Sequence, residues 1–336
     1  MANLDISVIV ICHNEERCIR AALESLAAQN YPASSFEVVV VENASTDKTA
    51  EVVREFVQDH PNMRLVSTSR RGIAPSRNRG LLEARFAHAA FTDADCIADA
   101  NWLSALDTAF REERMKDDRV AAVGGPNLMP VDSTFFRRAV AIAVSNYWGN
   151  HGSVQGAQFK ARVLVDHLPT LNVMYDRSRA LEVGGFDENQ GNIAEDVDIS
   201  HQLRWQGYIL IYESRAIVRH RWRESIWTWA KNMEVYGKGR SWLMKKDRRY
   251  IKPQLAAPLL TLLSLLAACF FPINVWLAVP FAAYLAMTAL VSLYACLVAR
   301  KPHYVFHVFV IYIVTHIAYA LGQVHGLMSP RGSDIR

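Results

Sequence analysis

Residues 36–47 read FEVVVVENASTD, a run of β-branched apolar residues followed at once by polar side chains. Such a run predicts a buried strand, and residues 47–58 continue with a helical pattern. Residues 6–28 repeat this order, because ISVIVI at 6–11 precedes a helical pattern that begins at residue 15. Further strands are predicted at 64–67 and 89–92, with a helix at 75–87 between them. Strands that alternate with helices predict an α/β domain with a mostly parallel sheet.

Polar clusters follow these strands at the ends where ligands bind in such sheets. HNEE follows the first strand at 13–16, ENASTD follows the second at 42–47, and Asp93 and Asp95 follow the fourth. Residues two apart in an extended segment point the same way, so these two aspartates present their carboxylates together. Paired carboxylates suit a hard divalent cation that also binds phosphate oxygens. Thr46 and Asp47 are expected to cap the second helix, while Asn43 and Asp47 also face the cleft.

A second acidic cluster lies farther along the chain. GGFD at 184–187 is followed by EDVD at 195–198, which opens a helical stretch at 199–206. Carboxylates at a helix start also favour the helix dipole. This cluster alone is therefore compatible with either a structural or a chemical role.

Composition and missing motifs exclude several classes of protein. A formal charge of +4 over 336 residues is too small to indicate nucleic-acid binding, and no zinc-finger spacing accompanies it. No GxGxxG follows a strand and no GxxxxGK[ST] occurs, which disfavours a dinucleotide oxidoreductase and a P-loop NTPase. The five cysteines form no CxxC pair, which predicts reduced thiols in a domain that faces the cytosol. The apolar run at 6–12 is too short for a signal peptide.

The last quarter of the chain is almost free of charge, with only Arg300 and Lys301 between residues 255 and 327. It contains three apolar stretches, at 255–271, 273–299 and 304–327. Their length predicts a membrane region of three spans, although the short first stretch could instead form a re-entrant hairpin with the second. The basic residues at 245–252 and 300–301 predict that both flanks face the cytoplasm and that the C-terminus lies outside.

Residues 219–252, just before these stretches, combine many Lys and Arg residues with Trp and Tyr. This composition predicts a basic amphipathic region at an anionic lipid surface. The expected organisation is an α/β domain at 1–218, the interfacial region at 219–252, the membrane region at 253–328 and a tail at 329–336.

Five segments together resemble family 2 glycosyltransferases with a GT-A fold. They are HNEE at 13–16, VENASTDKT at 41–49, GIAPSRNRG at 72–80, TDAD at 92–95, and GGFD at 184–187 before Glu195 and Asp196. The resemblance runs in order from about Ile6 to His220. The apolar tail resembles that of members which glycosylate lipid-linked or membrane-bound acceptors.

The resemblance implies an inverting transfer from a nucleoside-diphosphate sugar, assisted by Mg²⁺ or Mn²⁺. Asp95 and Asp93 are the implied metal ligands, and Asp196 is the implied general base with Glu195 beside it. The implied donor-binding residues are Asn14, Glu15, Asn43, Asp47, Arg77 and Asp93. His220 could touch the metal or be structural. Trp222, Lys238 and Arg240 could hold acceptor or donor phosphates or belong to a basic membrane-surface segment.

We expect one sugar, from a UDP-type or else a GDP-type donor, to be added to a polyprenyl-(di)phosphate-linked or other lipid acceptor. QLRW at 202–205 is one residue shorter than the QxxRW signature of processive synthases, which favours single addition. The expected location is the inner membrane, with several spans and the catalytic domain facing the cytoplasm. The alternatives are a processive polysaccharide synthase and a non-catalytic membrane scaffold with the same fold.

Overall fold

The structure is a computed structural model that describes residues 3–130, 133–150, 154, 159–220 and 225–333. The chain divides into two compact units. The α/β unit comprises Met1–Pro130 and Gln158–Arg221, and the helical unit comprises Val131–Ala157 and Trp222–Asp334. Residues 131–157, which the sequence analysis places inside the first domain, therefore cluster with the apolar helices.

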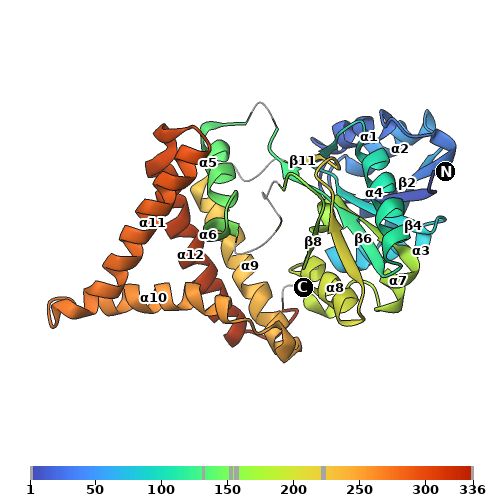
Figure 1. Cartoon of the computed structure of the whole chain (residues 1–336). Helices are drawn as coiled ribbons and strands as arrows, with labels where there is room; N and C mark the ends of the chain where they lie inside the picture. The colour runs from blue at the N-terminus through green and yellow to red at the C-terminus, as the bar shows by residue number, and fades with distance from the viewer. Residues whose placement is uncertain (1–2, 131–132, 151–153, 155–158, 221–224, 334–336) are drawn as a thin grey trace. The chain divides into compact units, whose positions relative to one another are not determined.

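The α/β unit is built on an eight-stranded sheet with the order β3-β2-β1-β4-β9-β6-β10-β8 (Figure 1). The strands are β1 (Ile6–Cys12), β2 (Phe36–Asn43), β3 (Met63–Thr68), β4 (His88–Asp93), β6 (Val120–Gly124), β8 (Val163–Val165), β9 (Val173–Asp176) and β10 (Ile209–Tyr212). β1 pairs in parallel with β2 and β4, and β2 with β3. Only β8 and β9 run antiparallel to their neighbours in this sheet of described strands. The predicted α/β fold with a mostly parallel sheet is confirmed.

Helices cover the sheet because alternate residues of each strand face opposite sides. Val8 and Val10 of β1 belong to a core that includes Leu23 of α1 (Ile19–Ala27) and Val53 of α2 (Thr49–Gln58). Ile9 faces α3 (Ile73–Glu83), where a Cβ on Gly80 would collide with the Ile9 side chain. The close approach of α3 to β1 therefore requires glycine at position 80.

A small second sheet and the remaining helices complete this unit. β5 (Cys96–Ala98), β11 (Val218–His220) and β7 (Asn127–Leu128) form the small sheet in the order β5-β11-β7. The other helices are α4 (Trp102–Lys116), α7 (Arg177–Glu182) and α8 (Glu195–Trp205), with 3₁₀ turns at Ala33–Ser35, Thr170–Asn172 and Glu188–Gln190. The small sheet brings His220 opposite Cys96 in an antiparallel pair.

The helical unit contains α5 (Phe135–Val144), α6 (Tyr147–Asn150), α9 (Ile226–Lys246), α10 (Ala256–Ala268), α11 (Val279–Val298) and α12 (Val305–Met328). Its 3₁₀ turns are Arg248–Tyr250, Pro253–Leu255, Val275–Ala278 and Pro302–Tyr304. Two segments, Val275–Val298 and Pro302–Met328, are long and apolar enough to cross a membrane. The first apolar stretch forms only the shorter segment Pro253–Ala268, so the count of three spans stays a prediction.

Helix α9, from the region predicted to lie at a lipid surface, packs along α12 in the same direction. Trp229 Nε1 donates to Thr315 Oγ1 at 2.9 Å near the start of α9, and Lys245 Nζ donates to the Ser329 carbonyl at 2.8 Å near its end. The end of α12 thus lies beside the basic segment that precedes α10. The expectation that this segment and the C-terminus lie on opposite sides of a membrane stays a prediction, and this contact is an observation that any membrane topology must accommodate.

Candidate active site

The predicted site residues gather at one edge of the large sheet. In the parallel register, Cys12 pairs with Glu42, and Ile11 pairs with Asp93. The loops after β1, β2 and β4 therefore begin side by side, as parallel strands with buried apolar runs require. Open α/β sheets bind their ligands just beyond the carboxyl ends of the strands, which is where these loops lie.

The loops after β1 and β2 are fastened to each other by their own polar side chains. Asn14 Oδ1 accepts from the Thr46 amide at 2.8 Å, and Thr49 Oγ1 accepts from the Glu15 amide at 2.7 Å. Asp47 accepts from the amides of Glu16 at 3.2 Å and Thr49 at 3.0 Å. Burial opposes ionisation of Asp47, but the hydrogen bonds from Thr49 and Glu16 outweigh it and lower its pKa. Asn14 and Asp47 thus shape the rim of the site.

Asn43 differs from these rim residues because only the nitrogen of its side-chain amide has a hydrogen-bond partner among the described residues, and the oxygen has none. Its Nδ2 donates to the Gly72 carbonyl at 3.2 Å, which ties the end of β2 to the start of α3. Its Oδ1 is buried and has no hydrogen-bond partner among the described residues. A buried acceptor without a donor is costly, and a ligand that donates a hydrogen bond here would remove that cost.

Arg77, a predicted donor-binding residue, lies buried between two predicted site carboxylates. Its guanidinium forms an ion pair with Glu195 at the start of α8 and another with Asp93 at 3.4 Å. Burial raises the pKa of Asp93 and of Glu195, and the Arg77 charge opposes both shifts. The arginine therefore links the end of β4 to the first turn of α8 and compensates two carboxylates in a dry environment.

Asp95, Cys96 and His220 form a cluster whose ligand atoms all lie within 4.8 Å of one another. His220 Nε2 lies 3.1 Å from Asp95 Oδ2, because β11 pairs with β5. Burial opposes ionisation of Asp95, but the contact with His220 outweighs it and lowers the pKa of Asp95. A carboxylate and an imidazole at this spacing fit a divalent cation. Asp93, the last residue of β4, adds a second carboxylate two residues before Asp95.

Asp196 faces His167, a residue that the sequence analysis does not single out. His167 Nε2 lies 3.2 Å from Asp196 Oδ2. Burial opposes ionisation of Asp196, yet the contact with His167 outweighs it and lowers the pKa of Asp196. His167 is a lone histidine in the loop after β8, so no motif in the sequence marks it.

Asn78 is another residue whose role the sequence analysis misses, although it lies within the GIAPSRNRG segment. Its Nδ2 donates to the Phe186 carbonyl at 2.9 Å, and its Oδ1 accepts from the Phe186 amide at 2.8 Å. Gly185 has φ of 67°, and a Cβ there would lie 2.6 Å from Asn78 Oδ1. The GGFD segment is thus held against α3, which fixes the loop that leads to α8.

The predicted acceptor and phosphate residues are Trp222, Lys238 and Arg240, and their role stays a prediction. Trp222 lies outside the described residues. Lys238 is buried in α9, with Nζ 4.7 Å from the centroid of the Trp242 ring, and Arg240 is half-buried on the same helix. Both belong to the helical unit.

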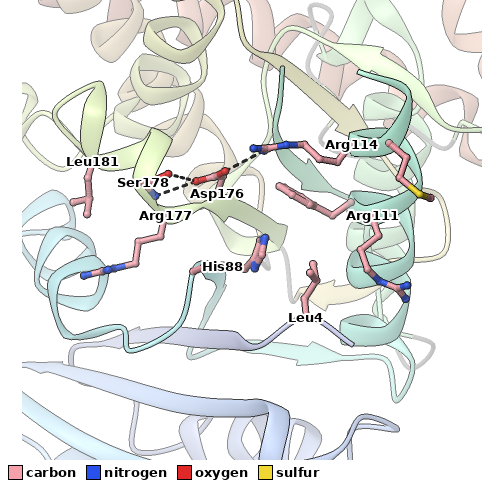
Figure 2. A pocket seen from close by; sticks show the side chains of 11 residues that line it. Leu4, His88, Arg111, Arg114, Asp176, Arg177, Ser178 and Leu181 are labelled. Atoms are coloured by element: carbon pink, nitrogen blue, oxygen red, sulfur yellow. Dashed lines mark hydrogen bonds and ion pairs between the residues drawn. The ribbon is translucent and has the colours of Figure 1, made fainter. Parts of the chain in front are cut away.

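A pocket of about 720 Å³ opens at the opposite edge of the sheet (Figure 2). Leu4 precedes β1, His88 begins β4, and Asp176 ends the antiparallel β9. Its arginines are held by the protein itself: Arg114 contacts Asp176 at 3.0 Å, and Arg177 Nε donates to the Leu81 carbonyl at 2.6 Å. None of the predicted site residues lines this pocket.

Comparison with known proteins identifies the family to which this sequence is similar. A model described as glycosyl transferase family 2 matches residues 7–174, and one described as glycosyl transferase family group 2 matches residues 91–321. The chain is 36% identical over 99 residues to Glycosyltransferase AglE of Haloferax volcanii, which is 29% of this chain and 33% of that protein. It is 25% identical over 217 residues to the poly-beta-1,6-N-acetyl-D-glucosamine synthase of Staphylococcus epidermidis, covering 63% of this chain and 48% of the synthase. The chain thus spans half or less of the length of these two relatives.

A solved structure shares the fold over nearly the whole chain. It is the mannosyltransferase PcManGT from Pyrobaculum calidifontis in complex with GDP-Man and Mn²⁺, with a TM-score of 0.61 and 22% sequence identity. The likeness covers 98% of this chain and 88% of that protein. The α/β unit thus has the GT-A fold of nucleotide-sugar transferases, as expected.

Proposed function

The chain belongs to glycosyl transferase family 2 and is a glycosyltransferase, and from its site we propose a single inverting transfer to a lipid-linked acceptor. The donor would be a nucleoside-diphosphate sugar, with UDP-type favoured and GDP-type as the other choice. The observation that carries the proposal is the spacing of two carboxylate groups around one buried arginine. Arg77 contacts both Asp93, beside the candidate metal cluster, and Glu195, beside Asp196.

The donor would bind at the edge formed by the loops after β1, β2 and β4. The buried Oδ1 of Asn43 supports a hydrogen-bond donor of the nucleoside at that point. Asn14, Glu15 and Asp47 would shape the rest of the nucleoside site from the rim. Asp93, Asp95 and His220 would hold Mg²⁺ or Mn²⁺, which would neutralise charge on the departing diphosphate. The solved neighbour with Mn²⁺ supports a divalent cation without deciding between the two metals.

Asp196 would act as the general base in a single displacement. The acceptor hydroxyl oxygen attacks the anomeric carbon, the bond from that carbon to the diphosphate oxygen breaks, and the hydroxyl proton passes to Asp196. The lowered pKa keeps this carboxylate ionised at neutral pH, which is the state that a general base requires. Because the bond forms on the side opposite the leaving group, the anomeric configuration inverts.

A lipid-linked acceptor, such as a polyprenyl-(di)phosphate-linked glycan, is supported by the apolar helices of the same chain. We propose that the chain is attached to the inner membrane and that the α/β unit faces the cytoplasm, where nucleotide sugars are made. Attachment to a membrane would bring a lipid-borne hydroxyl near this unit.

A processive polysaccharide synthase is the main alternative, because one relative is by name such a synthase. The shortened QLRW segment supports single addition instead. Product length on a gel separates the two, since a single addition gives one shifted band and polymerisation gives a ladder.

The first test is donor hydrolysis by the detergent-purified chain over a panel of nucleotide sugars with Mg²⁺, Mn²⁺ or EDTA. We expect metal-dependent release of nucleoside diphosphate from one donor. Calorimetry with Mn²⁺ follows donor binding separately. A chain that neither binds nor hydrolyses any donor would instead favour the non-catalytic scaffold.

The Asp196→Asn variant tests the base. It should bind donor like the wild type and lose transfer by about 10²–10⁴-fold, the usual contribution of a general base. Asp198→Asn, two residues along the same helix, is the matched control. Turnover of Asp196→Asn near the wild-type rate would exclude Asp196 as the base.

A further inference from the structure

Helices α9 and α12 of the helical unit are in direct backbone contact. A Cβ added at Gly237 would collide with the Tyr319 carbonyl, and one at Gly322 would collide with the Glu234 carbonyl. A Cβ at Gly326 would lie 2.6 Å from the Lys238 carbonyl. Small residues at such contacts allow helices to approach closely over their length. If α12 moves into the hydrocarbon of a bilayer, α9 must therefore move with it.

Helix α9 carries charged groups along the length of this pair. Lys231 and Lys245 are exposed, and Glu234 and Arg240 are half-buried. If α12 crossed a bilayer, the parallel α9 would bring several of these charges into hydrocarbon. Each charged side chain near the bilayer centre costs about 2.5–3.5 kcal/mol by insertion measurements. The pair is thus poorly suited to cross, although α12 alone is apolar enough.

The segment between these two helices has the opposite character. No residue from Pro253 to Ala299 is charged. Helices α10 and α11 form a hairpin whose connecting turn exposes large apolar groups, with Ile273 81% and Trp276 74% exposed. Exposing such large apolar side chains to water is energetically unfavourable. Their grouping at one turn therefore indicates contact with lipid.

The backbone of this connecting turn is hydrogen-bonded within itself. The amides of Ile273 and Asn274 donate to the Phe270 carbonyl at 2.9 and 3.2 Å. The Trp276 amide donates to Asn274 Oδ1 at 3.0 Å. Non-helical backbone tolerates hydrocarbon only when its polar groups are satisfied internally. The turn meets that requirement at these positions.

The hairpin leaves the α9–α12 pair at one end and returns at the other. Gln323 Nε2, near the end of α12, donates to the Leu255 carbonyl at 3.0 Å, just before α10 begins. Helix α11 ends at Val298, a few residues before α12 starts. Figure 1 shows α10, α11 and α12 as three sides of a triangle, with the α10–α11 turn at the corner farthest from α9.

Both ends of the pair are basic. Exposed Arg300 and Lys301 lie where α12 begins, and exposed Lys245, Arg248 and Arg249 lie where α9 ends. Juxtamembrane Lys and Arg residues each gain about 1 kcal/mol at an anionic lipid surface. The two basic ends, with an uncharged hairpin between them, are complementary to one face of an anionic bilayer.

We propose that the helical unit is a one-sided membrane wedge. The α10–α11 hairpin enters and leaves the hydrocarbon from the same face of a bilayer that contains anionic lipid. Helices α9 and α12 lie at the level of the headgroups on that face, with both basic ends against them. This arrangement replaces the multi-pass topology expected from composition, and it takes up the re-entrant hairpin that the short first stretch suggested.

Cysteine labelling with a membrane-impermeant maleimide tests the wedge in cells and in inverted membrane vesicles. The background is Cys18→Ser with Cys269→Ser, because Cys12, Cys96 and Cys296 are buried and are kept. The reporters are Lys301→Cys and Ser333→Cys at the two basic ends and Ile273→Cys at the turn. Leu82→Cys on the α/β unit marks the side of the catalytic unit.

We expect Lys301→Cys, Ser333→Cys and Leu82→Cys to react from the same face and Ile273→Cys to react only after detergent is added. Labelling of Lys301→Cys and Ser333→Cys from opposite faces would show that α12 crosses and would overturn the wedge. Labelling of Ile273→Cys from either face would overturn it as well. A single symmetric peak in detergent chromatography confirms that each variant folds. The result is independent of donor or acceptor, so it stands apart from the proposed transfer.

Discussion

At the scale of single residues, Arg77 is the connection on which the geometry of the site depends. Arg77→Met would leave Asp93 and Glu195 buried without their shared cation, and we expect a loss of about 3 kcal/mol in unfolding free energy. Arg79→Met, on the same helix, removes only a half-exposed ion pair with Glu83 and is the matched control. Thermal unfolding in detergent measures both variants. Equal and small shifts would show that the buried bridge contributes little.

His167 gives a prediction about pH at the same scale. The pKa of Asp196 is lowered chiefly by His167, so His167→Asn should raise it. Because the base must be ionised, the acid limb of log kcat/KM should then move to higher pH. His60→Asn, two residues after α2 and stacked on Phe56, should leave that limb in place. An unmoved limb in His167→Asn would separate this histidine from the base.

The sequence predicts some of the site residues but not the contacts between them, and the difference has a physical cause. Asp93 and Asp95 were predictable because an apolar strand ends just before them, which fixes where they emerge. The partners of Arg77 and of Asp196 were not, because these contacts join loops that only the tertiary fold brings together. None of these three ion pairs leaves a local pattern in the chain.

At the scale of elements, β-branched strands were predictable because their burial depends on a local run of residues. β2, for example, is buried along its whole length. The region that contains helix α9 was predicted to lie at an anionic lipid surface because its Lys and Arg residues are interleaved with Trp and Tyr. The burial of α9 depends on Gly237 meeting a helix more than eighty residues later, which no window of sequence contains.

Gly322 provides the test of that helix pair. In Gly322→Ala the new Cβ meets the Glu234 carbonyl, so the helices must move apart, and we expect a loss of about 2 kcal/mol in detergent. Leu321→Ala changes the exposed neighbour on the same helix and should cost less than about 0.5 kcal/mol. Circular dichroism melts compare the two variants. A Gly322→Ala melt that matches Leu321→Ala would show that α9 and α12 need not be in contact.

At the scale of the whole molecule, the chain passes between its two units three times, after residues 130, 157 and 221. The catalytic fold and the apolar helices are therefore joined by three chain segments instead of a single linker. Composition alone identified the apolar helices, because length and lack of charge are local properties. It could not assign residues 131–157 to them, because the longer helix described there, Phe135–Val144, carries two arginines and is too short to span a membrane.

Separating the two units functionally gives the last prediction. Ile273→Asp places a carboxylate at the exposed turn of the hairpin, and a charge in hydrocarbon costs about 3 kcal/mol. Vesicle binding in a flotation assay should weaken by about 100-fold. Metal-dependent donor hydrolysis in detergent should stay at the wild-type level, while transfer to a lipid acceptor in vesicles falls together with binding. Leu82→Asp, at an exposed position on the α/β unit, should change neither. If Ile273→Asp floats like the wild type, attachment must come from a surface other than this hairpin.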